Sequence, residues 1–440
     1  MDTITIREYG SFCIGNDNDK EVNGYHTLKK GTFDLLERFV LENTQEGKDE
    51  ALEIMGISAR RGIGKIITVK NYVGVIALKD GTTIEILPKI YSDKDSEENA
   101  RRLVVKMLNT LYNVSSKNLQ TANLNVDKMN ILEVFIRMFV DEVTRLTKQG
   151  LKSSYETLED NLTCFKGKIQ FSQHIRHNFA HKERVYVAYD EFTVNRPENK
   201  ILKSTLAYLH SHTRSSKNKK DIKNLLSIFS EVDPSVNYDA DFSHIVLDRN
   251  TKAYSTALNW ARVFLKKKSF TSFSGSTVSM ALLFPMEKLF ESYIPALMRR
   301  CLANTNAVIS TQDTRYHLIE APTKRFSLRP DIVLTANGKT YIMDTKWKRL
   351  SSDPSMHYGI SQGDMYQMYA YHRRYTAHGN DVDSVTLIYP AMPSIKGNIV
   401  FCTDDEKTKI RICFIDLYNA EKDTEEKSIK SLMNELGILT

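Results

Sequence analysis

The 440-residue sequence is poor in cysteine and contains no cysteine motif. Its five cysteines are odd in number and widely separated, and no two of them form a C-x-x-C pair. This pattern excludes a disulfide framework and a zinc ribbon, and it indicates a reducing compartment. The five are Cys13, Cys164, Cys301, Cys402 and Cys413.

Long apolar runs are also missing. No stretch of about 18 apolar residues occurs, so no membrane-spanning helix is expected. The first ten residues, MDTITIREYG, include acids and no apolar core, so they do not have the pattern of a signal peptide. We therefore expect a cytoplasmic protein that makes no contact with a membrane.

A phosphate-binding loop of the P-loop type is absent as well. Residues 338–340 (GKT) resemble the end of such a loop, but Val333 stands where its first glycine is required. Residues 64–65 (GK) fail in the same way, because Ala59 replaces the first glycine and Ile66 replaces the Ser or Thr. Any nucleotide-driven motor that works with this chain must therefore be another polypeptide.

The sequence does contain the composition of a folded protein, with 41% hydrophobic and 26% charged residues. A formal net charge of +7 permits contact with nucleic acid but does not establish it. The length indicates two or three domains. We expect an α/β multidomain protein with a β-rich N-terminal domain at 1–125, a mainly helical middle region at 126–265, and a C-terminal domain at 280–440. The last would carry a mixed central sheet flanked by helices.

Hydrophobic periodicity predicts the main secondary-structure elements. Near the N-terminus, a hairpin over 73–90 turns at Asp80-Gly81. The elements expected further along are helices over 131–151, 281–300 and 361–377, strands over 168–171 and 385–389, a solvated turn at 215–220 and a linker at 266–279.

The most informative segment is 328–348, LRPDIVLTANGKTYIMDTKWK. Asn337-Gly338 predicts a two-residue type I′ turn, because that turn needs positive φ at both central positions. Such a turn pairs Ala336 with Lys339, and the segment becomes a β-hairpin.

The same register places Asp331 directly opposite Asp344. Two like charges at that spacing destabilise a sheet, whereas a divalent cation between them removes the conflict. Strand periodicity puts Lys346 on the same face as Asp344. Two acids and a lysine at one point form a minimal set for metal-dependent phosphodiester hydrolysis. The alternative is a surface hairpin whose charged side chains face water, but the apolar strands at 332–334 and 341–343 favour a central sheet.

Three further side chains are candidates for the same site. Glu291 lies along the edge of the helix that precedes the hairpin, and Gln367 and Tyr371 share one face of the helix that follows it. The alternatives are a Glu291 paired with Lys288 or water, a Tyr371 in the core and an exposed Gln367. Glu287 is interpreted as a boundary residue without a role.

The order acid, RPDIVL hairpin, DTK, then Gln-x-x-x-Tyr resembles the PD-(D/E)xK nuclease superfamily in its RecB-like form. More specifically, the chain resembles the McrC family, the nuclease subunits of McrBC-type modification-dependent restriction systems. The segments that carry this resemblance are 84–90 (IEILPKI), 166–169 (KGKI), 190–192 (DEF) and 196–203 (RPENKILK). The resemblance spans most of the chain, and it implies a PD-(D/E)xK nuclease domain at 280–440.

The resemblance implies how the site residues would act. Asp331 and Asp344 would hold Mg²⁺, with Mn²⁺ able to substitute and the backbone carbonyl of Thr345 as a third ligand. Lys346 would position the attacking water or stabilise the transition state. The remaining candidates are Glu291, which would help to hold the metal or a second one, and Gln367 and Tyr371, which would orient the strands or contact DNA. Much of the superfamily has glutamate where this chain has Asp344, a shorter arm that leaves the number of metals open.

The resemblance also implies partners. The chain would dock on a hexameric McrB-like AAA+ GTPase and stimulate it, would meet GTP only through that partner, and would cut double-stranded DNA that the partner recognises as modified. Arg60, Arg61 and the hairpin tips are candidate contacts with the motor. The alternatives are a stand-alone repair or recombination nuclease and a non-catalytic regulator of an AAA+ motor.

Three histidines, His174, His177 and His181, recur at helical spacing, with Arg176 and Arg184 nearby. No fourth ligand or supporting carboxylate accompanies them, so a zinc site is disfavoured. The preferred interpretation is a basic helix that faces solvent or phosphate.

Overall fold

The computed structural model describes residues 3–15, 21–44, 54–89, 96–111, 130–246, 252–265, 272–273, 277–395, 397–403, 408–417 and 424–439. Several mixed sheets alternate with helices, which confirms the expected α/β class. Within these ranges, no helix has both the length and the apolar character needed to cross a membrane. The expected domain boundary near residue 125 and most of the expected linker lie outside the described residues.

The chain divides into two compact units. The first combines residues 1–131 with residues 273–440, and the second spans residues 132–272. The middle of the sequence is thus an insertion into a unit built from both ends of the chain. The three-part division expected from the sequence stays a prediction.

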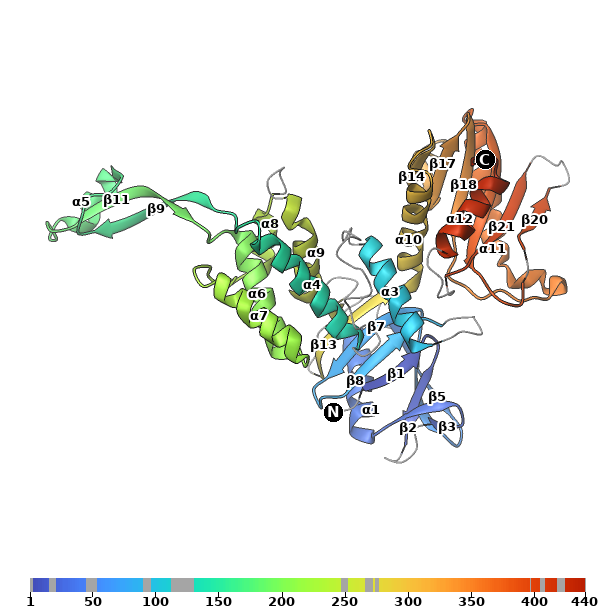
Figure 1. The fold of residues 1–440 in the computed structure, drawn as a ribbon, viewed down its shortest axis with the longest axis horizontal. Coiled ribbons are helices and arrows are strands. Elements are labelled where there is room, and N and C mark those ends of the chain that lie inside the picture. Colours follow the sequence, from blue (N-terminus) through green and yellow to red (C-terminus); the bar gives the residue numbers. More distant parts are fainter. Residues whose placement is uncertain are drawn as a thin grey trace. The chain divides into compact units, whose positions relative to one another are not determined.

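Two five-stranded sheets form the N-terminal part of the first unit (Figure 1). One has the order β1 (Thr3–Arg7), β8 (Thr83–Leu87), β7 (Tyr72–Leu78), β13 (Val278–Pro285) and β12 (Ser272–Phe273). The other has the order β3 (Glu21–Val22), β4 (Tyr25–Leu28), β2 (Ser11–Ile14), β6 (Gly64–Val69) and β5 (Met55–Arg60). With helix α1 (Lys30–Thr44), both sheets contribute to one core that includes Phe12, Leu36 and Ile76. Helix α3 (Glu97–Leu111) follows these strands.

Strand β13 corrects one expectation. The sequence predicted a helix over 281–300, but β13 extends to Pro285, and helix α10 begins only at Met286 and ends at Cys301. The apolar run at the end of β13 pairs with β7 as an inner strand of the sheet, so sheet pairing overrides local helix propensity. Gly74 permits the close approach: its φ is 140°, and an added Cβ would lie 1.9 Å from the Leu282 carbonyl oxygen.

Helices build most of the second unit. They are α4 (Ile131–Thr147), α6 (Pro197–His212), α7 (Ser216–Ile228), α8 (Tyr238–His244), the short 3-10 helix η2 (Lys252–Tyr254) and α9 (Ser255–Leu265). The turn expected at 215–220 is wrong, because these residues begin α7. The Ser215 side chain accepts a hydrogen bond from the Asn218 backbone N–H and so caps the helix.

A long β-ribbon also belongs to this unit and extends away from its helices (Figure 1). Strands β9 (Ser154–Leu162) and β11 (Val185–Thr193), each nine residues long, pair antiparallel along their whole length. The short strand β10 (Lys168–Ile169) joins β11, and helix α5 (Phe171–Asn178) follows it. The expectation of a mainly helical middle region missed this ribbon. Helix α5 also ends before His181, so the three histidines do not share one helix.

The segments that carry the family resemblance in this unit have structural roles. Gly167 (φ 74°) lies so close to the Ala188 carbonyl oxygen that an added Cβ would stand 2.3 Å from it. Beside it, the Lys166 ammonium stacks over the Tyr189 ring at 3.8 Å. At the start of α6, the buried Asn199 amide donates to the carbonyls of Lys152 and Val194. The Gly167 and Lys166 contacts lie along the middle of β11, and the Asn199 contacts fix the base of the ribbon to the helices.

The C-terminal part of the first unit is built on a six-stranded mixed sheet. Its strand order is β14 (Val308–Thr311), β17 (Ile332–Ala336), β18 (Lys339–Thr345), β19 (Val382–Pro390), β21 (Lys409–Ile415) and β20 (Ile399–Cys402). Strands β18, β19 and β21 run parallel, and the other neighbours pair antiparallel. The remaining elements are α10, the 3-10 helix η3 (Pro354–Gly359), α11 (Gln362–Ala377), α12 (Thr424–Glu435) and the small hairpin β15 (His317–Ile319) with β16 (Arg325–Ser327).

Helices cover both faces of this sheet. Neighbouring strand residues point to opposite faces. Ile342 belongs to the same core as Met368 of α11, whereas the Tyr341 hydroxyl donates to the carbonyl of Leu436, just after α12. Helices α11 and α12 therefore pack on opposite faces, and strands β17 and β18 are buried between layers.

The β17–β18 hairpin has the expected turn and register. Asn337 and Gly338 have φ values of 52° and 78°, and Ala336 pairs with Lys339. The strand pairing continues to Ile332 with Met343. Asp331 therefore immediately precedes β17, while Asp344 lies inside β18.

Candidate functional site

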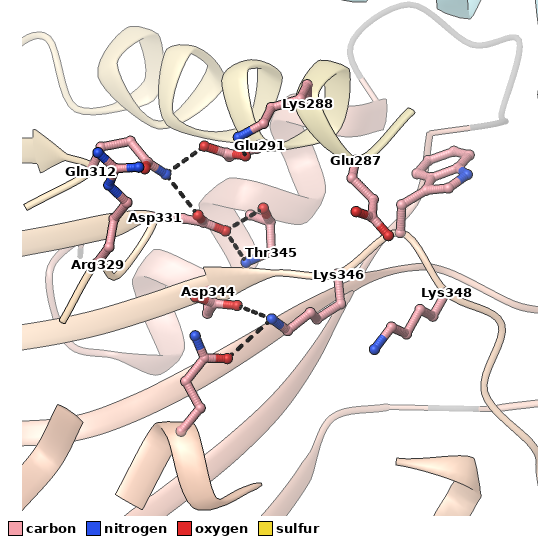
Figure 2. A pocket seen from close by; sticks show the side chains of 12 residues that line it. Glu287, Lys288, Glu291, Gln312, Arg329, Asp331, Asp344, Thr345, Lys346 and Lys348 are labelled. Atoms are coloured by element: carbon pink, nitrogen blue, oxygen red, sulfur yellow. Dashed lines mark hydrogen bonds and ion pairs between the residues drawn. The ribbon is translucent and has the colours of Figure 1, made fainter. Parts of the chain in front are cut away.

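A cavity of about 310 Å³ opens where the ends of β17 and β18 meet the first turns of α10 and the N-terminal half of α11 (Figure 2). It is strongly polar. The lining residues are Glu287, Lys288, Glu291, Gln312, Arg329, Asp331, Asp344, Thr345, Lys346, Trp347, Lys348 and Gln367.

Asp331 is held from two sides. Its Oδ2 accepts hydrogen bonds from the Thr345 backbone N–H (2.8 Å) and from the Thr345 hydroxyl (2.7 Å). Its Oδ1 accepts from the side-chain amide of Gln312 (2.9 Å). These contacts fix the Asp331 carboxylate at the open end of the β17–β18 hairpin, with Thr345 and Gln312 on either side (Figure 2).

Glu291 reaches the same point from α10. The Gln312 amide donates to Glu291 as well as to Asp331, so a single side chain bridges the two acids. Lys288 contacts the other Glu291 oxygen at 3.2 Å. Burial and then the nearby charge of Asp331 raise the pKa of Glu291. Glu291 therefore contacts Lys288 and lies at the site at the same time, so the pairing with Lys288 and the position at the site do not exclude each other.

Asp344 is the most deeply buried acid of the cavity, with 3% of its surface exposed. Burial, and then the negative charge of Asp331, raise its pKa from 3.8 to about 6, although Lys346 opposes that rise. The Lys346 ammonium lies 2.6 Å from Asp344 Oδ2. Burial alone would lower the pKa of Lys346, but the charge and hydrogen bond of Asp344 outweigh it and raise that pKa. The lysine is thus held as a cation against the acids.

Gln367 and Tyr371 form a chain behind Lys346. The Gln367 carbonyl oxygen accepts from Lys346 (3.2 Å), and its amide donates to the Tyr371 hydroxyl (2.7 Å). Tyr371 does not line the cavity; it is buried in the core under α11, and burial followed by the charge of Asp344 raises its pKa. Tyr371 therefore orients Gln367, which in turn orients Lys346.

Sequence reasoning missed several members of the site. Asp364, on the first turn of α11, lies 3.7 Å from the Lys346 ammonium and 3.2 Å from that of Lys348. Gln312 follows β14 directly and belongs to no sequence motif. Only the fold brings it to Glu291. Glu287, interpreted from the sequence as a boundary residue, also lines the cavity. For Arg329 the RPD context offered a signal, because Arg329 stands two residues before Asp331.

The donor set fits a hard divalent cation. No cluster of three or more His, Cys, Asp or Glu side chains at metal-ligating spacing occurs in the described ranges. Mg²⁺ needs only one or two carboxylates, since it retains most of its waters. The charge of Asp331 contributes to the raised pKa of Asp344, and a bound cation would relieve that repulsion. The histidines of the second unit do not form a comparable site: His174 hydrogen-bonds Asn178, His177 stacks on Tyr186, and His181 pairs with Glu183.

Fold and site together define a mixed α/β protein with an acid–acid–lysine centre at the end of a central hairpin. The sequence model of the family described as McrBC 5-methylcytosine restriction system component matches residues 67–390. This chain therefore belongs to the McrBC family and is a component of a restriction system of that kind.

Two solved structures have a similar fold. A chain of the refined half-complex from the tetradecameric assembly of Thermococcus gammatolerans McrB AAA+ hexamers with bound McrC is 18% identical, with a TM-score of 0.68; the match covers 99% of this chain and 100% of that one. A chain of the cryo-EM structure of the Thermococcus gammatolerans McrBC complex is 19% identical, with a TM-score of 0.51, and the match covers 68% and 88% of the two chains. No curated protein matches this sequence.

Proposed function

We propose that this chain is the DNA endonuclease subunit of its restriction system and that it hydrolyses phosphodiester bonds in a Mg²⁺-dependent reaction within a PD-(D/E)xK domain. The observation that carries the proposal is the convergence of Asp331, Asp344 and Lys346 in one cavity, with Glu291 beside them. The family match makes DNA the expected substrate.

Asp331 and Asp344 would hold the metal, with the Thr345 backbone carbonyl as a further ligand and Glu291 within reach of the same point. When bound, Mg²⁺ would activate a water molecule and neutralise charge on the scissile phosphate, and Mn²⁺ would serve as a substitute. Thr345 supports this arrangement because its N–H and hydroxyl both orient Asp331.

Lys346 would act on the reacting phosphate. Its ammonium stays charged because Asp344 lies 2.6 Å away, and Gln367 fixes its direction. A fixed cation in a buried site stabilises charge that develops in the transition state, or it positions the attacking water. Gln367 contributes by orientation, and Tyr371 acts through Gln367.

The partner would be an McrB-like AAA+ GTPase hexamer. The two similar structures are of McrB AAA+ hexamers with bound McrC and of an McrBC complex. This chain has no recognisable nucleotide-binding loop, so GTP would act only through that partner. The β9–β11 ribbon supports a protein-contacting role, because it exposes large apolar side chains that a lone ribbon cannot bury. These are Tyr155, Phe165, Phe171, Phe179 and Phe192. Arg60 and Arg61, at the end of β5 and in the turn after it, remain candidates for a second contact.

The test is cleavage of plasmid DNA with and without 5-methylcytosine, in Mg²⁺, with the chain alone and with the neighbouring AAA+ protein plus GTP. Asp344→Ala would be compared with Asp383→Ala, a control acid of the same sheet whose partner is Lys339. We expect cleavage only in the presence of the partner and GTP, its loss in Asp344→Ala and its retention in Asp383→Ala.

Each of the other outcomes would support a different function or site. Cleavage by the chain alone would indicate a stand-alone nuclease. GTPase stimulation with no cleavage under any condition would indicate a non-catalytic regulator. Full cleavage by Asp344→Ala would overturn the site assignment.

A further inference from the structure

Residues 313–330 lie in the connection between β14 and β17. Both ends of this segment, here called the excursion, lie beside the site. The Gln312 side chain contacts Asp331 at 2.9 Å, and the Gln312 backbone N–H donates to the Asp331 carbonyl at 3.1 Å. The two ends of the excursion are thus joined at the proposed catalytic acids. The base of the excursion therefore lies next to the cavity.

The base of the excursion is firmly held. The Tyr375 hydroxyl of α11 donates to the buried Asp313 (3.0 Å), which also pairs with Arg315. The Tyr316 ring packs edge-on against Tyr375, and the Tyr316 carbonyl accepts from the Leu328 N–H at 2.9 Å. The hairpin β15–β16 therefore projects from a rigid support.

The β15–β16 hairpin exposes apolar side chains on both of its strands. Every residue from 318 to 327 is exposed. Leu318, Ile319 and Phe326 have 47%, 41% and 71% of their surfaces exposed, although such side chains are usually buried. Phe326 also has a φ of 56°, which is a strained conformation for a bulky residue and one that clusters at ligand-contacting sites.

The charged side chains on and near this hairpin are mainly positive. Lys324 and Arg325 immediately precede Phe326 in the sequence, and Arg329 lies at the cavity wall (Figure 2). The acid of the tip, Glu320, is paired with Arg374 of α11 at 2.8 Å. An exposed aromatic ring beside cations suits a polyanion with stacked rings, such as duplex DNA.

We propose that the β15–β16 hairpin binds duplex DNA beside the scissile phosphate and inserts Phe326 at a base step. The inference rests on the proposed nuclease function. Lys324, Arg325 and Arg329 contact phosphates, and the exposed phenylalanine acts as an apolar wedge of the kind that unstacks and kinks DNA. Because the hairpin is fixed to Gln312 and Asp331, the distortion positions one phosphate at the cavity.

The experiment uses the full complex with the AAA+ partner and GTP, in an Asp344→Ala background that leaves the DNA uncut. Permanganate oxidises unstacked thymines, so the position of the wedge need not be known. Phe326→Ala is compared with Phe326→Leu, which keeps a wedge, and with Val400→Ala, an exposed apolar control on β20. We expect Phe326→Ala to lower the permanganate reactivity about fivefold or more, and both others to retain it.

Cleavage gives a second readout. In the chain with Asp344 intact, Phe326→Ala should slow cleavage about tenfold through mispositioning, while stimulation of the partner's GTPase stays unchanged. Replacing both Lys324 and Arg325 by alanine should reduce the slope of log binding constant against log salt by about 2. Unchanged cleavage and permanganate patterns in Phe326→Ala would overturn the inference. Loss of GTPase stimulation with an unchanged permanganate pattern would also overturn it, in favour of a protein contact.

The two proposals fail separately. If the unsubstituted complex does not cleave DNA, the nuclease proposal is wrong. The permanganate readout needs only bound DNA, so it still decides whether Phe326 unstacks a base step.

Discussion

Replacing Asp344 by asparagine should stabilise the metal-free protein while it abolishes cleavage. Burial and the charge of Asp331 raise the pKa of Asp344 from 3.8 to about 6. A rise of about two pH units at about 1.4 kcal/mol each makes the ionised carboxylate cost about 3 kcal/mol of folding free energy above pH 6. Asparagine has nearly the same shape and no charge, so it removes most of that cost.

The sign follows from the raised pKa. Between about pH 4 and pH 6 the folded state binds a proton at Asp344 that the unfolded state has released, so stability falls as the pH rises through this window. Above pH 6 both states are ionised and the cost is constant. Asp344→Asn should therefore be more stable than the wild type by about 1–3 kcal/mol near pH 8, and by about half as much near pH 5.

The assay is urea unfolding in EDTA, followed by tryptophan fluorescence. The chain has two tryptophans. Trp260 is buried in the second unit and Trp347 lies next to the site, so a Trp260→Phe background leaves Trp347 as the reporter of the first unit. Asp383→Asn serves as the control and should change stability by less than about 0.5 kcal/mol. An Asp344→Asn protein that is no more stable than the wild type near pH 8 would refute the reasoning.

Three other outcomes are expected. Lys346→Met should slow cleavage by about 100-fold or more, because the fixed cation is lost, while Mg²⁺ still stabilises the protein against urea; normal cleavage rates would contradict this role. Gln312→Ala should weaken Mn²⁺ binding about tenfold in calorimetry, because Glu291 and Asp331 lose their shared donor, and an unchanged affinity would count against it. Mg²⁺ affinity should fall about tenfold per pH unit below pH 6 and level off above it, because Asp344 must release its proton; affinity that does not vary between pH 5 and pH 7 would exclude this linkage.

The part of the site that local geometry alone predicts is the part encoded in one hairpin, whereas Glu291, Gln367 and Tyr371 were named from helix position and family resemblance. Asn337 and Gly338 determine the turn, the turn determines the register, and the register with strand periodicity places Asp344 and Lys346 on one face. Each step depends on residues only a few positions apart. The prediction therefore needed no knowledge of the rest of the fold.

The residues that were missed reach the site only through tertiary structure. Gln312 follows an edge strand and Asp364 begins a helix, and neither stands in a local pattern that distinguishes it from a solvated polar residue. The strand at 281–285 was missed for a related reason. Its apolar run is compatible with a buried helix or a buried strand, and only pairing with β7 decides between them. In the second unit, β9 and β11 alternate weakly because much of the ribbon is exposed on both faces, so periodicity gave no strand signal.

Asp331 links the sequence argument to the electrostatics of the site. The register alone indicated that Asp331 and Asp344 would repel each other. In the structure, the charge of Asp331 is, after burial, the leading cause of the raised pKa values of both Asp344 and Glu291. An arrangement that served only stability would not gather two acids around Asp331 and then hold Asp331 there with Gln312 and Thr345. A cation at Asp331 would lower both pKa values at once, so the repulsion in the metal-free protein supports the proposed metal site.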